Sequence, residues 1–247
     1  MFDLLIRNAQ VLDGTGAPAY LADVAVKDGK IAAVGKLSGE AAETADAAGL
    51  TLAPGFIDVH GHSDFFMPLD PARASKLLQG VTTELCGQCG LGPAPVTEQN
   101  YPVYHKYLSQ QGIPMYPDDR TFTSFSAYLS RMEQTPAGIN LAYFIPHGTV
   151  RLAVMGFSHD APDDRQLAQM RELVEDAMQA GALGLSTGLA YAPGRFAATD
   201  ELAALTEPVG RYGGVYTSHL RDQGDQLEQS VQEAIDIARR GGARVNV

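Results

Sequence analysis

The first fifty residues alternate between apolar and polar positions in short runs. Alternation with a period of two is typical of half-buried β-strands. The runs lie at Leu4–Val11, Asp23–Val26 and Lys30–Val34. Asp-Gly turns at residues 13–14 and 28–29 follow the first run and precede the third. The pattern predicts a hairpin region with little helix, in which the small and polar segment Ala41–Ala48 is a connector.

From Phe56 onward, apolar strand-like runs alternate with amphipathic segments, which is typical of a parallel sheet built from βα units. The expected strands are Phe56–His60, Thr82–Cys86, Leu141–Ile145, Leu183–Ser186, Val215–Ser218 and Arg244–Val247. Two helices are clearly marked, Asp163–Ala180 and Asp225–Arg240, because apolar residues gather on one face of each and glycine follows the last turn.

Parallel strands in this number could form a doubly wound sheet or most of an eight-stranded barrel. No phosphate-binding glycine fingerprint follows the first strand, so we predict an α/β protein with a (β/α)8 TIM-like barrel, strands 1–6 of which lie in residues 54–247. Residues 92–137 are expected to be an insertion that folds over the barrel mouth. Because such a barrel needs two more strands to close, we expect a C-terminal remainder of the barrel as partner.

The composition limits the class of protein but does not distinguish between the two folds. The chain of 247 residues is 45% hydrophobic and 19% charged, and no apolar run is long enough to span a bilayer. The net charge of −11 repels nucleic-acid phosphates. Asp3 and Arg7 interrupt the first residues, unlike a secretory signal. We therefore expect a cytoplasmic protein with no nucleic-acid partner and no membrane partner.

The strongest chemical signal is His60-Gly61-His62 directly after the first apolar strand. Side chains two residues apart on a strand point to the same face, so both imidazoles should project at the strand's C-terminal end, where barrel active sites lie. Two imidazoles at that spacing can hold one metal ion, although a lone histidine is more often a packing residue. The motif predicts a metal site.

The chain has two cysteines, Cys86 and Cys89, spaced as C-x-x-C. A structural zinc site would need a second pair, which is missing, and a redox pair would need to open a helix. Cys89 falls past the second strand among glycines that allow close approach to an ion, whereas Cys86 lies inside the strand. We interpret Cys89 as a thiolate ligand and Cys86 as a packing residue.

Two further histidines follow strands. His219 ends the fifth strand on the same rim as His60 and His62, which predicts a third imidazole for the cluster, with a loop hydrogen bond as the alternative. His147 ends the third strand and could support the site, contact substrate or simply pack. No lysine follows Lys106, so a carboxylated lysine on the fourth strand cannot bridge two metals, and the anionic Cys89 could take that place.

These motifs resemble the amidohydrolase superfamily and, within it, the N-acyl-D-amino-acid deacylases or D-aminoacylases. The matching stretches are Ala53–Asp58 with His60 and His62, Gln79–Thr83, Gly87–Gly90, Gly184–Gly188 with Tyr191, and Gly213–Tyr216 with His219–Asp222. The resemblance covers nearly the whole chain and is weakest in the insertion.

The resemblance implies a barrel with a small N-terminal β-sandwich, here residues 1–53, completed from the other chain end. It implies one Zn²⁺ held tightly by Cys89, His219 and a further histidine, with His60 and His62 contributing to a second, weaker site. That further histidine and the general-base aspartate lie beyond this chain, which would then be the N-terminal half of the enzyme, and the catalytic residue itself is unknown. Tyr191 is similar to the family tyrosine near the substrate carboxylate.

The implied reaction cleaves a small-molecule N-acyl-D-amino acid to a carboxylate and a free D-amino acid. A rival is a cyclic amidase such as a dihydroorotase or hydantoinase, which shares His-x-His but is disfavoured by the missing lysine. A second rival is a non-catalytic metal-binding half-barrel. The preference for acidic or neutral amino acids, the acyl group, the number of metals and the oligomeric state stay open.

Overall fold

The structure is a computed structural model that describes residues 1–66, 74–113 and 122–247. The chain divides into two compact units, Met1–Phe56 and Ile57–Val247. Within the described ranges, no helix combines the length and apolar character needed to cross a bilayer.

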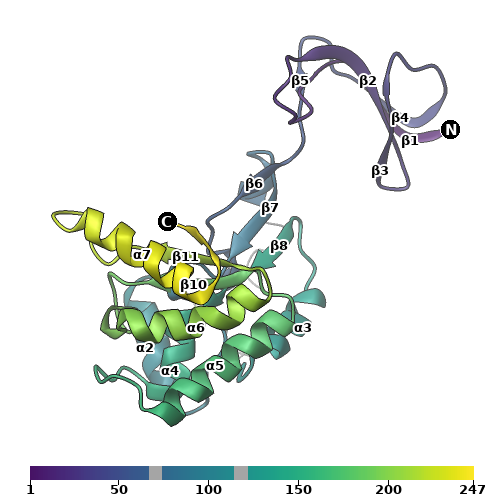
Figure 1. The fold of residues 1–247 in the computed structure, drawn as a ribbon. Coiled ribbons are helices and arrows are strands. Elements are labelled where there is room, and N and C mark those ends of the chain that lie inside the picture. Colours follow the sequence, from purple (N-terminus) through teal and green to yellow (C-terminus); the bar gives the residue numbers. More distant parts are fainter. Residues whose placement is uncertain (67–73, 114–121) are drawn as a thin grey trace. The chain divides into compact units, whose positions relative to one another are not determined.

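The first unit is a five-stranded sheet (Figure 1). Its strands are β1 (Phe2–Val11), β2 (Tyr20–Lys27), β3 (Lys30–Gly35), β4 (Ala41–Asp46) and β5 (Thr51–Leu52). β1 pairs antiparallel with β2, and β2 pairs antiparallel with β3, which confirms the predicted hairpins. The connector predicted at Ala41–Ala48 is wrong, because its first six residues form β4 in parallel with β1.

The second unit contains every predicted strand of the βα pattern. These are β6 (Phe56–Asp58), β7 (Val81–Cys86), β8 (Asn140–Tyr143), β9 (Ile145–Pro146), β10 (Gly184–Gly188), β11 (Val215–His219) and β12 (Arg244–Asn246). The predicted third strand is divided into β8 and β9 at Phe144, whose N–H bonds the Cys86 carbonyl at 2.9 Å. β6, β7 and β8 form one sheet, and β9 to β12 form another in chain order.

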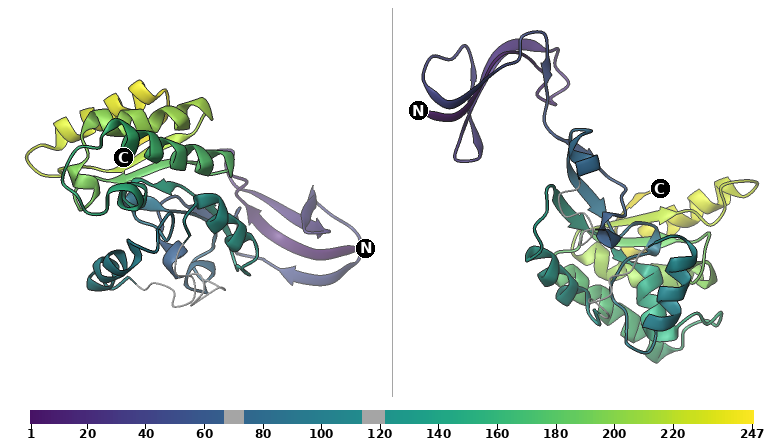
Figure 2. Two further views of the ribbon diagram at one scale, coloured as in Figure 1. Left: turned by 90° about the horizontal axis from the view of Figure 1, so that it is seen from below. Right: turned by 180° about the vertical axis from the view of Figure 1, so that it is seen from behind.

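The pairs β7–β8, β9–β10, β10–β11 and β11–β12 are all parallel. Figures 1 and 2 show helices gathered along these strands. The longer helices are α2 (Tyr101–Gln110), α3 (Phe125–Glu133), α4 (His147–Met155), α5 (Asp164–Gln179), α6 (Thr199–Arg211) and α7 (Leu227–Gly241), and α1 (Ala74–Leu77) is a short turn. The parallel strands and intervening helices confirm the α/β class.

Two of these helices match the clearly marked predictions. α5 begins with a capping box in which Asp163 accepts from the Gln166 N–H, and α7 is followed by Gly242, which caps it with a left-handed backbone. The expected insertion contains α2 and α3, while its residues 114–121 lie outside the described part of the chain. Buried apolar residues of α5, α6 and α7 share one core with β9, β10 and β11.

Candidate metal centre

The candidate ligands all follow the carboxyl ends of strands in the second unit. His60 and His62 come after β6, Cys89 lies in a single 3₁₀ turn (η2, Gln88–Gly90) after β7, and His219 is the last residue of β11. Because parallel strands direct their carboxyl ends to one side, side chains far apart in sequence can meet there.

The structure brings these side chains together. One ligand atom from each of His60, His62 and Cys89 lies within 4.8 Å of the others. The Nε2 atom of His60 is 3.2 Å from Cys89 Sγ, and that sulfur is 3.9 Å from Nδ1 of His219. Cys89 therefore lies between imidazoles from opposite ends of the unit's sequence.

The separations suit a shared zinc ion. With Zn–N near 2.1 Å and Zn–S near 2.3 Å, a nitrogen and a sulfur on one tetrahedral zinc lie about 3.5 Å apart. The sulfur–nitrogen distances of 3.2 and 3.9 Å lie on either side of that value. Imidazole and thiolate are also the donors that zinc prefers in proteins. The residues present therefore fit a zinc ion.

Burial sets the protonation of these donors. Desolvation lowers the pKa of His60 and of His62, which keeps the imidazoles neutral with a lone pair available for metal. Desolvation raises the pKa of the Cys89 thiol, against the opposing effect of a hydrogen bond with Tyr191. Because metal binding requires the thiolate, a cation at this site has to displace the Cys89 proton.

A buried carboxylate supports the His-x-His segment. Glu84 in β7 is fully buried and accepts hydrogen bonds from the Ser63 N–H at 3.2 Å and from its hydroxyl at 2.6 Å. A Cβ at Gly61 would overlap the Glu84 carboxylate, so this position requires glycine. Lys76 bonds Asp58 and lies 3.6 Å from Glu84. Glu84 was not among the predicted site residues, although a charged residue inside an expected buried strand is a signal for such a role.

Tyr191 lies beside the cluster. Its ring centroid is 5.0 Å from that of His219, and its hydroxyl hydrogen bonds with the Cys89 thiol. The next residue, Ala192, accepts a hydrogen bond of 2.7 Å from the Tyr107 hydroxyl of α2, in the expected insertion. Tyr191 is therefore near the predicted metal site, and its contact with substrate stays a prediction.

His147 lies apart from the cluster in a buried polar group. Its side chain is fully buried, and Nε2 donates to Glu201 Oε1 at 3.0 Å. Arg151 Nε donates to the same oxygen at 3.2 Å. The predicted substrate contact of His147 stays untested, and its complete burial favours the alternative that the residue has a packing role.

Arg221, from the motif that contains His219, fixes a loop. It pairs with Glu233 through two nitrogens, at 2.8 and 2.9 Å, and donates to the carbonyls of Arg195 and Ala197. These bonds connect the segment after Tyr191 to the middle of α7. The guanidinium therefore has a structural part in shaping the rim.

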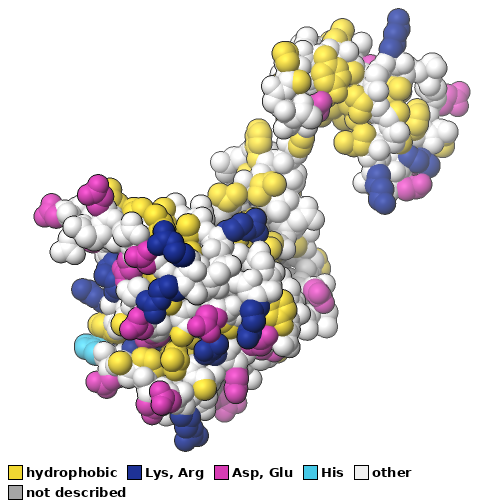
Figure 3. All heavy atoms as spheres, viewed as in Figure 1, with side chains coloured by type: hydrophobic (Ala, Val, Ile, Leu, Met, Phe, Trp, Pro, Cys, Tyr) yellow, Lys and Arg dark blue, Asp and Glu magenta, His cyan; other side chains and the backbone are white. Residues whose placement is uncertain are grey.

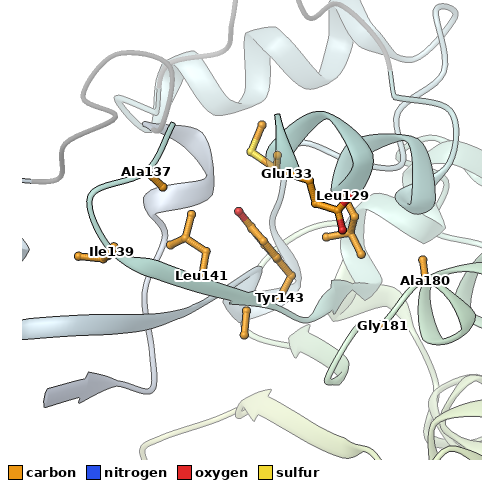
Figure 4. Close-up of a pocket in the computed structure, with 10 residues that line it drawn as sticks. Leu129, Glu133, Ala137, Ile139, Leu141, Tyr143, Ala180 and Gly181 are labelled. Atoms are coloured by element: carbon orange, nitrogen blue, oxygen red, sulfur yellow. The ribbon is translucent and has the colours of Figure 1, made fainter. Parts of the chain in front are cut away.

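A pocket of about 320 Å³ lies elsewhere in the unit (Figure 4). It is lined by Ile139 and Leu141 at the start of β8, by Leu129 and Glu133 of α3, and by Gly181 before β10. Ile139 and Leu141 lie at the amino end of β8 and Gly181 precedes β10, and Tyr143 at the other end of β8 also lines the pocket. The candidate ligands instead lie at or just after the carboxyl ends of their strands. In parallel α/β folds the amino ends of strands serve stability more often than chemistry, so we assign no ligand to this pocket.

Comparisons with known proteins agree with this arrangement. Residues 43–246 match the model of the amidohydrolase family. The chain is 38% identical over 239 residues to a D-aminoacylase of Alcaligenes xylosoxydans xylosoxydans, covering 96% of this chain and 48% of the relative. It is 38% identical over 245 residues to the N-acyl-D-aspartate deacylase of the same organism, covering 98% and 48%.

A solved structure shares the fold throughout. The N-acyl-D-glutamate deacylase of Bordetella bronchiseptica, complexed with zinc and a phosphonate inhibitor, superposes with a TM-score of 0.90 at 36% identity. The match covers 100% of this chain and 51% of that structure's chain. The chain therefore spans about half the length of the relatives that it matches.

Proposed function

Because this chain belongs to the amidohydrolase family, we propose that the protein is a zinc-dependent hydrolase that cleaves the amide bond of N-acyl-D-amino acids. The products are a carboxylate and a free D-amino acid. The observation that carries the proposal is the convergence of His60, His62 and Cys89 within 4.8 Å, with His219 beside the sulfur.

The residues that would hold the metal divide into two sets around Cys89. Cys89 and His219 would contribute to a tightly held zinc, and His60 and His62 to a second, weaker site that shares the thiolate. A zinc ion there would supply Lewis-acid activation of the amide carbonyl and of a water nucleophile. The geometry supports this assignment, because the Cys89 sulfur lies 3.2 Å from a nitrogen of His60 in one set and 3.9 Å from a nitrogen of His219 in the other.

The chain's own residues prepare the site for that chemistry. Burial keeps His60 and His62 neutral and able to bind a cation near pH 7. Glu84 holds the backbone directly after His62 by accepting a hydrogen bond from the Ser63 N–H. We assign no general base, because none of the four residues proposed to hold the metal is an aspartate.

Tyr191 is our candidate for contact with the substrate. Its ring lies against His219, and its hydroxyl is next to the Cys89 sulfur, so a substrate carbonyl bound near the metal would also be near the phenol. We propose that the phenol donates to the substrate carboxylate. For His147 we instead propose a packing role, in which it donates to Glu201.

The same proposal includes the fold of the whole protein. The strands β6 to β12, with β8 and β9 counted as two parts of one strand, would form the first six strands of a (β/α)8 barrel, and the sheet of β1 to β5 would form part of a small β-sandwich. An eight-stranded barrel needs two strands more than these. On this view residues 1–53 and 54–247 belong to separate domains.

The test uses the full-length protein with N-acetyl-D- and N-acetyl-L-amino acids, acidic and neutral. We expect hydrolysis of the D series, zinc in the purified protein, and loss of activity with a chelator that added zinc restores. Cys89→Ala is expected to abolish activity and zinc retention together. Tyr191→Phe is expected to raise KM without zinc loss.

Cys86→Ala is the matched control, because it removes a cysteine three positions away that is fully buried in β7 and belongs to the core. It should retain both zinc and activity. Hydrolysis of hydantoin or dihydroorotate in place of the D-amides would replace the proposal with a cyclic amidase. Bound zinc without turnover on any amide would point to a non-catalytic metal-binding protein.

A further inference from the structure

One buried hydroxyl ties down both ends of the loop that carries Cys89. The Ser186 side chain, fully buried in β10, donates to the Gly87 carbonyl oxygen. The Ser186 hydroxyl oxygen also accepts a hydrogen bond from the Gly90 N–H at 3.1 Å. These bonds bridge 99 and 96 positions of sequence, so they fix the loop to a strand that is remote along the chain.

The loop needs such support because its backbone is unfavourable. Cys89 has φ 58° and ψ 23°, in the left-handed region. For a residue with a Cβ this region costs about 1–2 kcal/mol. The neighbouring chain is packed closely as well, since a Cβ at Gly87 would overlap the Phe144 carbonyl and one at Gly188 would overlap the Cys89 carbonyl.

The loop conformation decides where the sulfur lies. With Ser186 in place, Cys89 Sγ is 3.2 Å from His60 Nε2 and 3.9 Å from His219 Nδ1. Without the hydroxyl, the Gly90 N–H and the Gly87 carbonyl would lose their partner in a buried place, which favours a rearranged loop. A rearrangement of the loop would move the sulfur away from both imidazoles.

We propose that Ser186 is a positioning residue that aims the Cys89 thiolate at the metal. The proposal rests on the proposed function, because it assumes that Cys89 is a metal ligand. It assigns the hydroxyl no contact with substrate and no proton transfer.

The test compares Ser186→Ala with Thr187→Val in the full-length protein. Thr187 is the next residue of the same strand and equally buried, but its hydroxyl bonds those of Tyr216 and Ser218, each at 2.9 Å, and does not contact the loop. Zinc affinity is measured by competition with a chromophoric chelator. The thiolate-to-metal absorption band of the Co²⁺-loaded protein reports whether the sulfur binds.

We expect Ser186→Ala to weaken zinc binding about 10–100-fold, the usual effect of removing a group that orients a ligand, and to reduce the thiolate band. Thr187→Val should retain the wild-type values of both. If Ser186→Ala does not fold, Ser186→Thr takes its place, and because it keeps the hydroxyl it should bind zinc as the wild type does.

Two results would overturn the proposal: a folded Ser186→Ala with wild-type affinity and thiolate band, or an equal loss in Thr187→Val. A folded Ser186→Thr that binds zinc about 10-fold or more weakly than the wild type would also count against it. Failure of the proposed function looks different, because the wild-type protein itself would then bind no zinc or show no thiolate band.

Discussion

Glu201 in α6 is a buried carboxylate shared by two basic side chains. Its side chain is 3% exposed and accepts from His147 at 3.0 Å and from Arg151 at 3.2 Å. Burial acts to raise the pKa of Glu201, but the hydrogen bond from His147 and the charge of Arg151 outweigh it and lower that pKa. Arg151 also donates to the carbonyls of Ser158 and Asp160, so the group joins α4, α6 and the loop between α4 and α5.

We predict that Glu201→Gln destabilises the protein. The substitution keeps the shape of the side chain but leaves the buried Arg151 guanidinium without a counter-charge, which should cost about 3 kcal/mol of unfolding free energy at pH 7. Urea denaturation of the wild type and the variant measures the difference. Glu175→Gln, which removes a carboxylate paired with Arg211 at the surface, should have a much smaller effect.

We also predict that the stability difference between the wild type and Glu201→Gln depends on pH. Because the pKa of Glu201 is lowered in the fold, its contribution is present above the ordinary value of 4.5 and is lost as the pH falls through the lower folded pKa. The difference in stability between wild type and Glu201→Gln should therefore shrink as the pH is reduced below 4.5. A difference that stays constant over that range would contradict the assignment.

At the scale of elements, α6 and α7 approach each other at glycines. A Cβ at Gly210 would overlap the Gly241 carbonyl, and one at Gly241 would overlap the side chain of Thr206. The two helices pack side by side across β11 (Figure 2). Small residues at such a contact let helix axes come closer than larger side chains allow.

Gly241→Ala is therefore predicted to be destabilising. In an open helix, replacing glycine with alanine usually stabilises by up to about 1 kcal/mol. At this contact the added methyl forces α6 and α7 apart, and overpacking of this kind costs about 1–3 kcal/mol. Chemical denaturation gives the sign of the change in the free energy of unfolding. Gln229→Ala, on the exposed side of α7, is the control and should change that free energy little. A stabilised Gly241→Ala would show that the helices separate freely.

The elements that the sequence predicted are those with strong periodicity. The βα strands and helices α5 and α7 repeat apolar residues at clear spacings, so they could be identified from residues alone. β4 could not, because Ala41–Asp46 is small and polar and is a strand only through its pairing with β1. α2 and α3 were missed because Pro, Tyr and Ser obscure helical spacing in the insertion.

The candidate site was predictable to the extent that its residues follow strands. Each of the four candidate ligands comes at a strand end, so the sequence alone predicted that they share one rim: His60, His62, Cys89 and His219. Glu84 and Ser186 could not be assigned in this way, because their partners at Ser63 and at Gly87 and Gly90 come from other segments. Hydrogen bonds across long stretches of sequence leave no local pattern.

At the scale of the whole molecule, the candidate ligands all belong to the unit Ile57–Val247. Figure 3 shows acidic and basic side chains interspersed on the viewed face of this unit. Arg171 and Glu207 form one of the unit's ion pairs, at 2.6 Å. A metal that binds only the native state raises the free energy of unfolding by mass action. At a free metal concentration a thousandfold above Kd, the increase is about 4 kcal/mol.

Removal of the metal should therefore loosen one unit and leave the other unchanged. We predict that a chelator lowers the unfolding temperature and speeds amide hydrogen exchange in η2 and at the end of β11. Exchange in β1 to β4, within Met1–Phe56, should stay the same, because that unit contributes no candidate ligand. Hydrogen exchange followed by mass spectrometry distinguishes the segments, and equal acceleration in both units would contradict the prediction.

The left-handed backbone at Cys89 also limits what evolution or design could place there. Valine, isoleucine and threonine are poorly tolerated in this conformation, whereas aspartate, asparagine and histidine adopt it more readily. Exchange of the sulfur for a carboxylate could thus preserve the chain path while offering a harder donor, which narrows the preference for zinc over harder ions such as manganese. The choice of metal at this centre is therefore open to change through one codon, within the narrow set of amino acids that the turn accepts.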